Sequence, residues 1–286
     1  MIELSVSYFG RDTQDNDNLY RLLSDLQPEP YALDFDAIGF LKPPGVMALL
    51  LAIRYIKEQT GHPVSILNLD DKLKSYLERV NFFDVGQQWL KIDEILPERR
   101  WDRNPETTSL LELTPITNAL DVAQAMERAE AIFSRWLQMP NLSSLLTVIS
   151  ELCSNIYQHS GDPHGFVIIQ RYQYHSRSEV EVILAAGDLG QGIRGSLQQK
   201  HPQLDGTPLN YIRAAMNGTT SRESGRGGLG LRTVEETIDK EGGYVWLRTE
   251  TAGLRSFGPG RHYPDEELAF MPGTQVVVEF RAPLPD

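Results

Sequence analysis

A stripe of polar residues on an otherwise apolar segment is the feature that most constrains this chain. Glu151, Asn155 and His159 follow one another at intervals of four residues, and at about 3.6 residues per turn they share one face of a helix. Cys153 points away from them, with the apolar residues. A polar stripe that is buried without partners costs stability. The segment 143–159 is therefore predicted to be a helix whose polar face needs an explanation beyond packing.

A second motif, Asp188-Leu-Gly190-Gln-Gly192, follows the apolar segment 179–186, which is predicted to be a strand. An acidic residue at a strand end commonly forms a turn. It can instead be a buried acceptor for an exocyclic amine, such as the amine of adenine, and the glycines would let a ring lie close to the backbone. Both interpretations stay open for this motif taken alone.

A third motif, Gly225-Arg226-Gly227-Gly228-Leu229-Gly230, precedes a segment predicted to be a helix up to Lys240. Its spacing matches the dinucleotide-binding fingerprint, but the segment before it is a polar loop and not an apolar strand. Glycines ahead of a helix let backbone N–H groups approach phosphate oxygens, whose charge the helix N-terminus favours. A flexible connector is the alternative interpretation.

The three motifs together predict binding of ATP with Mg²⁺. Asn155 can offer one oxygen to Mg²⁺, which takes its other ligands from water and phosphates. Glu151, one turn away, can polarise a water or a hydroxyl group that attacks the γ-phosphate. For His159 we favour a packing role at the helix end.

The order of these motifs resembles the GHKL ATP-binding fold of gyrase, Hsp90, histidine kinases and MutL, over roughly Thr114 to Phe280. The resemblance implies a two-layer α/β sandwich, in which helices cover one face of a mixed sheet, and a mobile lid, here Arg194 to Ser224. It implies Glu151 as the catalytic residue. The nucleotide-binding residues that it implies, on the three motifs and on Gly273-Thr274 ahead of the last strand, are Asn155, Asp188, Gly190, Gly192, Arg222, Gly225, Arg226, Gly227, Gly228, Leu229, Gly230 and Thr274.

The segment pattern predicts an α/β (α+β) chain of two domains. Residues 1–95 alternate between strand-like and helix-like segments, 96–112 form a polar, proline-bearing linker, and 113–286 form the nucleotide-binding domain. Predicted strands cover 2–9, 31–40, 64–69, 165–174, 179–186, 243–250 and 275–281, and predicted helices cover 45–59, 70–80, 120–137, 143–159, 208–216 and the segment ending at 240.

Residues 32–85 resemble a STAS domain, the fold of anti-sigma-factor antagonists. In the antagonists a Ser or Thr that accepts phosphate precedes a loop glycine. Here Pro44 precedes Gly45 and has no hydroxyl group. The resemblance therefore implies a docking or sensing domain and not a substrate fused to its own kinase.

The tract Thr219-Thr-Ser-Arg222 resembles that of anti-sigma-factor serine kinases, whereas no histidine stands in the sequence context of a phosphorylated sensor histidine. This resemblance implies a regulatory serine/threonine kinase or ATPase that acts on a separate partner, a sigma factor or a STAS-type antagonist. The alternative is an ATP-gated switch or scaffold without kinase activity. Formation of a homodimer is a further interpretation that stays open.

The composition of the chain limits the classes of partner and the cellular compartment that we expect. With 39 acidic and 27 basic residues the net charge is -12, so we expect no nucleic-acid partner. The longest apolar run, Val46 to Ile53, is too short to span a bilayer, and Met1-Ile-Glu-Leu lacks the basic start of a signal peptide. One cysteine fits a reducing cytoplasm.

Overall fold

The computed structural model describes most of the chain, as two compact units. The units are residues 1–106 with 112–114, and residues 107–111 with 115–286. Strand β4 (Leu110–Ile116) begins within the predicted linker, of which residues 96–108 lie outside the described part. The described residues are 1–6, 9–10, 15–92, 109–173, 179–204, 206–219 and 230–284.

The described residues of the first unit form a small α/β structure, as the sequence predicts. Its three strands pair in parallel in the order β1-β2-β3. The strands are β1 (Ile2–Ser5), β2 (Tyr31–Asp34) and β3 (Ser65–Leu67), and the helices are α1 (Asp15–Arg21), α2 (Pro43–Thr60), α3 (Asp71–Arg79) and α4 (Phe82–Gly86). The observed strands are shorter than the sequence predicts.

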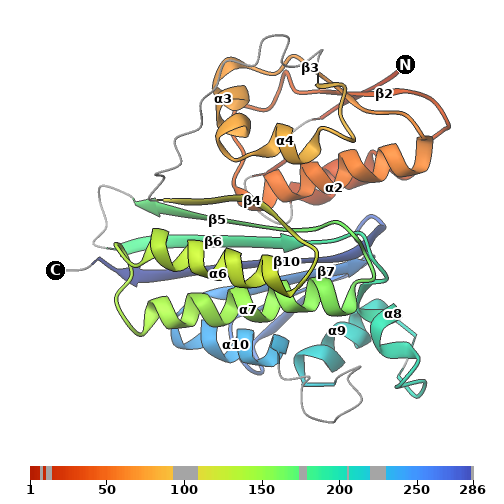
Figure 1. Ribbon diagram of the computed structural model, residues 1–286. Coiled ribbons are helices and arrows are strands. Elements are labelled where there is room, and N and C mark those ends of the chain that lie inside the picture. Colours follow the sequence, from red (N-terminus) through yellow and green to blue (C-terminus); the bar gives the residue numbers. More distant parts are fainter. Residues whose placement is uncertain are drawn as a thin grey trace. The chain divides into compact units, whose positions relative to one another are not determined.

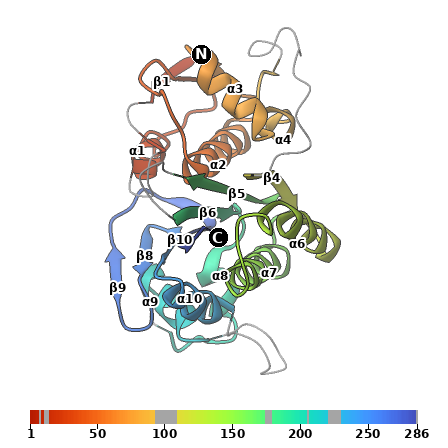
Figure 2. The same ribbon diagram turned by 90° about the vertical axis from the view of Figure 1, so that its left-hand side faces the viewer.

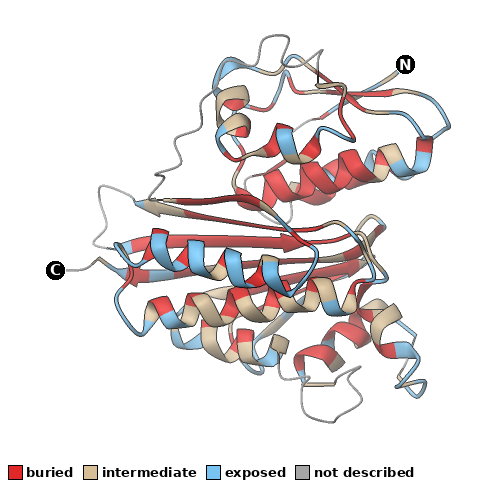
Figure 3. Ribbon diagram, viewed as in Figure 1, coloured by how far each residue is buried: buried red, intermediate tan, exposed pale blue. Residues whose placement is uncertain are grey.

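Helix α2 is the core element of the first unit (Figure 3). Its residues 43–54 are all buried, because the segment is apolar on every side. Pro44 lies in the first helical turn, where a missing N–H leaves no helical bond unmade. Gly61 ends the helix at a φ of +78°. Among the described helices, α2 included, none combines the length and the hydropathy needed to cross a membrane.

The second unit is a two-layer sandwich, which confirms the predicted fold class. In its described residues seven strands form one sheet in the order β4-β5-β6-β10-β7-β8-β9, and the pairs from β5 to β9 are antiparallel. The strands after β4 are β5 (Gly165–Gln173), β6 (Glu179–Gly187), β7 (Tyr244–Glu250), β8 (Ala252–Ser256), β9 (His262–Asp265) and β10 (Met271–Pro283).

Helices cover one face of this sheet, as Figures 1 and 2 show. Apolar side chains from both layers, among them Val148, Leu184, Val234 and Val278, form one buried core. The helices are α6 (Ala119–Phe133), α7 (Asn141–His159), α8 (Gly192–Gln198), α9 (Pro208–Met216) and α10 (Gly230–Lys240).

The described part of the segment predicted as a loose lid is built differently. Residues 192–198 form helix α8, which the sequence pattern did not predict, and Ile193 and Leu197 bury one side of it. Ile212 and Met216 anchor α9 in the same core. Arg194, at the predicted lid boundary, pairs with Glu250 of β7 at 3.0 Å. Apolar residues four apart thus outweigh the polar, glycine-bearing composition that suggested a loop.

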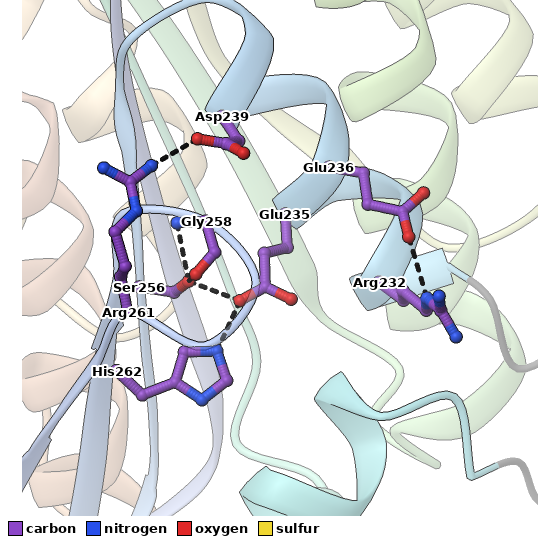
Figure 4. Close-up of polar contacts among 8 residues, drawn as sticks. All are labelled: Arg232, Glu235, Glu236, Asp239, Ser256, Gly258, Arg261 and His262. Atoms are coloured by element: carbon purple, nitrogen blue, oxygen red, sulfur yellow. Dashed lines mark hydrogen bonds and ion pairs between the residues drawn. The ribbon is translucent and has the colours of Figure 1, made fainter.

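A buried carboxylate fastens α10 to the hairpin of β8 and β9 (Figure 4). Glu235 is 4% exposed. Its Oε1 accepts a hydrogen bond from the Ser256 hydroxyl and lies 2.5 Å from His262 Nε2. The Ser256 hydroxyl in turn accepts from the Gly258 N–H at 3.1 Å. These contacts fix the helix on the sheet, because each buried polar group has its partner.

We predict that Glu235→Ala lowers the free energy of unfolding by about 2–4 kcal/mol, because it leaves the buried Ser256 hydroxyl without its acceptor and breaks a buried network. Glu236, its neighbour, pairs with Arg232 on the exposed side, so Glu236→Ala should change the same quantity by about 0.5 kcal/mol or less. Urea unfolding of both variants measures the difference. Equal losses would contradict a fastening role for Glu235.

Candidate functional site

A pocket opens at one end of the second unit, between the helical layer and the sheet. Of the described site residues that the sequence predicts, five line it: Asn155, Asp188, Gly192, Gly230 and Thr274. They come from α7, the loop after β6, the start of α8, the start of α10, and β10. Segments up to about 120 residues apart in sequence thus meet at one cavity, whose other walls include the apolar Leu152, Ile156, Ile193, Leu197, Ala215 and Val276.

Helix α7 presents the polar stripe on its pocket side. Glu151, Asn155 and His159 are each half-buried, and Asn155 and His159 line the pocket. Cys153 lies fully buried within the core, and this burial raises the pKa of its thiol to about 12. The helix therefore has an apolar side in the core and a polar side at the pocket.

Gly230 brings the first turn of α10 against Glu151 and Asn155. A Cβ atom at Gly230 would lie 2.7 Å from Glu151 Oε2 and 3.6 Å from Asn155 Nδ2. The missing side chain thus allows the close approach of these two helices. Because Gly230 also lines the pocket, a carboxylate, a carboxamide and a helix N-terminus converge at this end.

Asp188 lines the same pocket from the loop after β6. The residue is 4% exposed, and its Oδ1 accepts a hydrogen bond from the Gly190 N–H at 2.9 Å. Its backbone N–H donates to the Thr274 carbonyl at 3.0 Å. Gly273, at a φ of +78°, leaves room for the Asp188 carbonyl, which a Cβ atom there would meet at 2.1 Å.

Gly190 and Gly192 are packing requirements of the same loop. A Cβ atom at Gly190 would lie 2.1 Å from the Ser160 carbonyl oxygen. Gly192 has a φ of +67°, and a Cβ atom there would lie 2.6 Å from Thr249 Oγ1. Gly190 is therefore required for steric reasons, and Gly192 for both steric and conformational reasons.

Most of the third motif lies outside the described part of the chain. Arg222, Gly225, Arg226, Gly227, Gly228 and Leu229 lie outside the described residues, and Gly230 is the member of the motif that the structure describes. The described residues contain no group of three or more His, Cys, Asp or Glu side chains that could hold a metal ion. The Asn155 carboxamide can supply one oxygen to Mg²⁺, a cation that takes its other ligands from phosphates and water.

The sequence reasoning missed the residues that support this loop from behind. Asp162 Oδ2 accepts the Leu189 N–H at 2.6 Å. The buried Thr249 hydroxyl donates to the Gly273 carbonyl at 2.8 Å and accepts from the Ile193 N–H at 3.4 Å. An aspartate in a turn and a threonine in a strand are common, so no local signal distinguished them.

A family model for histidine kinase-, DNA gyrase B- and HSP90-like ATPases matches residues 141–284. The match begins at the first residue of α7, ends one residue after β10, and includes every residue of the pocket wall named above. A search of curated proteins found no match to the chain.

We predict that Gly190→Ala destabilises the second unit by about 1–3 kcal/mol, since the new methyl group would collide with the Ser160 carbonyl oxygen. Gly206→Ala is the control, because a Cβ atom at Gly206 meets nothing within 4 Å. Thermal unfolding should show the first variant weakened and the second unchanged or slightly stabilised. A Gly190→Ala protein as stable as the wild type would refute the packing argument.

Proposed function

The chain belongs to the family of histidine kinase-, DNA gyrase B- and HSP90-like ATPases, and we propose that it binds ATP with Mg²⁺ in the described pocket to regulate a separate protein. One observation carries the proposal. The pocket wall brings together a buried carboxylate, Asp188, and the Asn155 carboxamide beside Gly230. This arrangement offers an acceptor to a base and a polar, glycine-lined surface to phosphates.

At the base end, Asp188 would accept a hydrogen bond from the 6-amino group of adenine. One of its oxygens is engaged by the Gly190 N–H, which fixes the orientation of the carboxylate. Gly192 and the apolar side chains of Leu152, Ile156 and Val276 also line the pocket, and would contact the ring. A carboxylate that accepts from an amine favours adenine over bases that present a carbonyl oxygen there.

At the phosphate end, the N–H groups at the start of α10 and the Asn155 carboxamide would contact the triphosphate. Helix N-termini favour negative charge, and Gly230 begins α10 in the pocket wall. Asn155 would supply one oxygen ligand to Mg²⁺, which would offset the negative charge of the phosphates. Arg222 and Arg226 remain candidates for phosphate contacts.

Glu151 supports a reaction beyond binding. Its carboxylate lies one turn before Asn155 and against Gly230, so it can accept the proton of an attacking hydroxyl group. Attack by water breaks the bond between the γ-phosphorus and its bridging oxygen, and gives ADP and phosphate. Attack by a Ser or Thr hydroxyl group of a partner gives ADP and a phosphoprotein.

The proposed partner is a sigma factor or a STAS-type antagonist, which an anti-sigma-type kinase or ATPase would phosphorylate or remodel. The first unit would act as a docking or sensing domain of STAS type. Pro44, at the start of α2, has no hydroxyl group, so the acceptor would belong to the partner. This proposal rests on the motif resemblances in residues 32–85 and 219–222.

We predict that Asp188→Asn weakens ATP binding about ten- to a hundred-fold, which corresponds to about 1.5–3 kcal/mol for a hydrogen bond to a charged group. Titration calorimetry with ATP and Mg²⁺ measures the dissociation constant. Asp239→Asn removes an exposed carboxylate that pairs with Arg261 and should leave the affinity unchanged. Wild-type affinity for ATP in the Asp188→Asn variant would contradict the placement of adenine beside Asp188.

We predict that Glu151→Ala retains ATP binding but lowers turnover about 10²–10⁴-fold, the usual contribution of a general base. Incubation of the wild type with γ-labelled ATP and cell lysate distinguishes the reactions. Label on a lysate protein indicates a kinase, free labelled phosphate indicates an ATPase, and binding without either product indicates a gated switch or scaffold. Unchanged turnover in the variant would leave Glu151 with a structural role.

A further inference from the structure

The turn that follows α7 is bonded to the loop that carries Asp188. Asp162 Oδ2 accepts the Leu189 N–H at 2.6 Å, and its Oδ1 accepts the His164 N–H at 2.9 Å. The Gln191 N–H donates to the Ser160 carbonyl at 2.8 Å. Both carboxylate oxygens of Asp162 thus have donors, and one of these donors belongs to the peptide that joins Asp188 to Leu189.

This bond restrains the backbone that follows Asp188, while a bond to β10 restrains the backbone that precedes it. The Asp188 N–H donates to the Thr274 carbonyl at 3.0 Å, and Asp188 Oδ1 accepts the Gly190 N–H at 2.9 Å. The orientation of the Asp188 carboxylate therefore depends on the backbone of residues 188–190. The Asp162 carboxylate accepts the hydrogen bond from the Leu189 N–H in this backbone.

The same turn connects the Asp188 loop to helix α7. The Ser160 N–H still donates to the Ile156 carbonyl of α7 at 3.1 Å, so the turn starts where the helix that bears Glu151 and Asn155 ends. A restraint from Asp162 on Leu189 consequently fixes the base end relative to the phosphate end. Binding geometry held in this way depends on such supporting contacts.

We propose that Asp162 is a positioning residue for recognition of the adenine base. The inference rests on the proposed binding of ATP: Asp162 holds the Asp188 loop so that the Asp188 carboxylate faces the 6-amino group. Without this carboxylate the Leu189 N–H loses its acceptor and the loop can turn. A variant without the Asp162 carboxylate should therefore discriminate less between adenine and a base that lacks the 6-amino group. Its contacts with the phosphates should remain.

The test compares ATP with purine riboside 5′-triphosphate, which lacks the 6-amino group, by calorimetry with Mg²⁺ on the full chain. We expect the wild type to prefer ATP about ten- to a hundred-fold. In Asp162→Ala this ratio should fall to about threefold or less, while the affinity for the analogue stays within about threefold of the wild-type value. A general loss of folded protein would reduce the binding of both nucleotides equally and would leave the ratio of their affinities unchanged.

Asp121→Ala is the matched control. Asp121 also accepts backbone hydrogen bonds, from Thr117 and Asn118 at the start of α6, but it is not part of the pocket wall. Its removal should leave the ratio unchanged. Asp162→Asn keeps one acceptor oxygen for two N–H donors and should give an intermediate ratio, and it replaces Asp162→Ala in the comparison if that variant does not fold.

The outcomes separate this inference from the function on which it rests. A wild type that binds neither nucleotide overturns ATP binding itself. Equal wild-type affinity for the two nucleotides overturns the adenine contact at Asp188 and the role of Asp162 with it. A wild type that discriminates, together with an Asp162→Ala protein that discriminates equally well, overturns the positioning role alone.

Discussion

The site depends on how closely the backbone of residues 188–192 approaches the segments around it. Side chains at Gly190 and Gly273 would each come within 2.1 Å of a backbone oxygen, so the loop fits only where these positions lack a Cβ atom. Hydrogen bonds from Asp188 to Thr274 and from Gln191 to Ser160 then fix it. This close packing allows one carboxylate to be buried at the pocket wall in a defined orientation.

The rest of the second unit fixes the position of that loop relative to the polar stripe on α7. Glu235 anchors α10 to β8 and β9 from within the core, and Gly230 brings the start of the same helix against Glu151. A helix that is fixed along its length can present its N-terminus to a charged ligand without moving. Thr249, which is 1% exposed, supports the loop from the sheet side.

Local patterns predicted the elements that carry their own signal. The spacing of Glu151 and Asn155 indicated a helix that the structure has at Asn141–His159, and the glycines after Asp188 indicated a tight loop. Contacts between distant segments gave no such signal. Asp162 lies 27 residues from Leu189, and strand β4 (Leu110–Ile116) forms in a region whose neighbouring polar residues suggested a linker, because pairing within the sheet outweighs local composition.

The most direct test is an experimental structure of the full chain with a non-hydrolysable ATP analogue and Mg²⁺. The account predicts the adenine 6-amino group within hydrogen-bond distance, about 2.7–3.2 Å, of the Asp188 carboxylate. It also predicts the phosphates between Asn155 and the start of α10, and the Leu189 N–H still bonded to Asp162. An analogue bound in another place, or bound here with its base away from Asp188, would contradict the account.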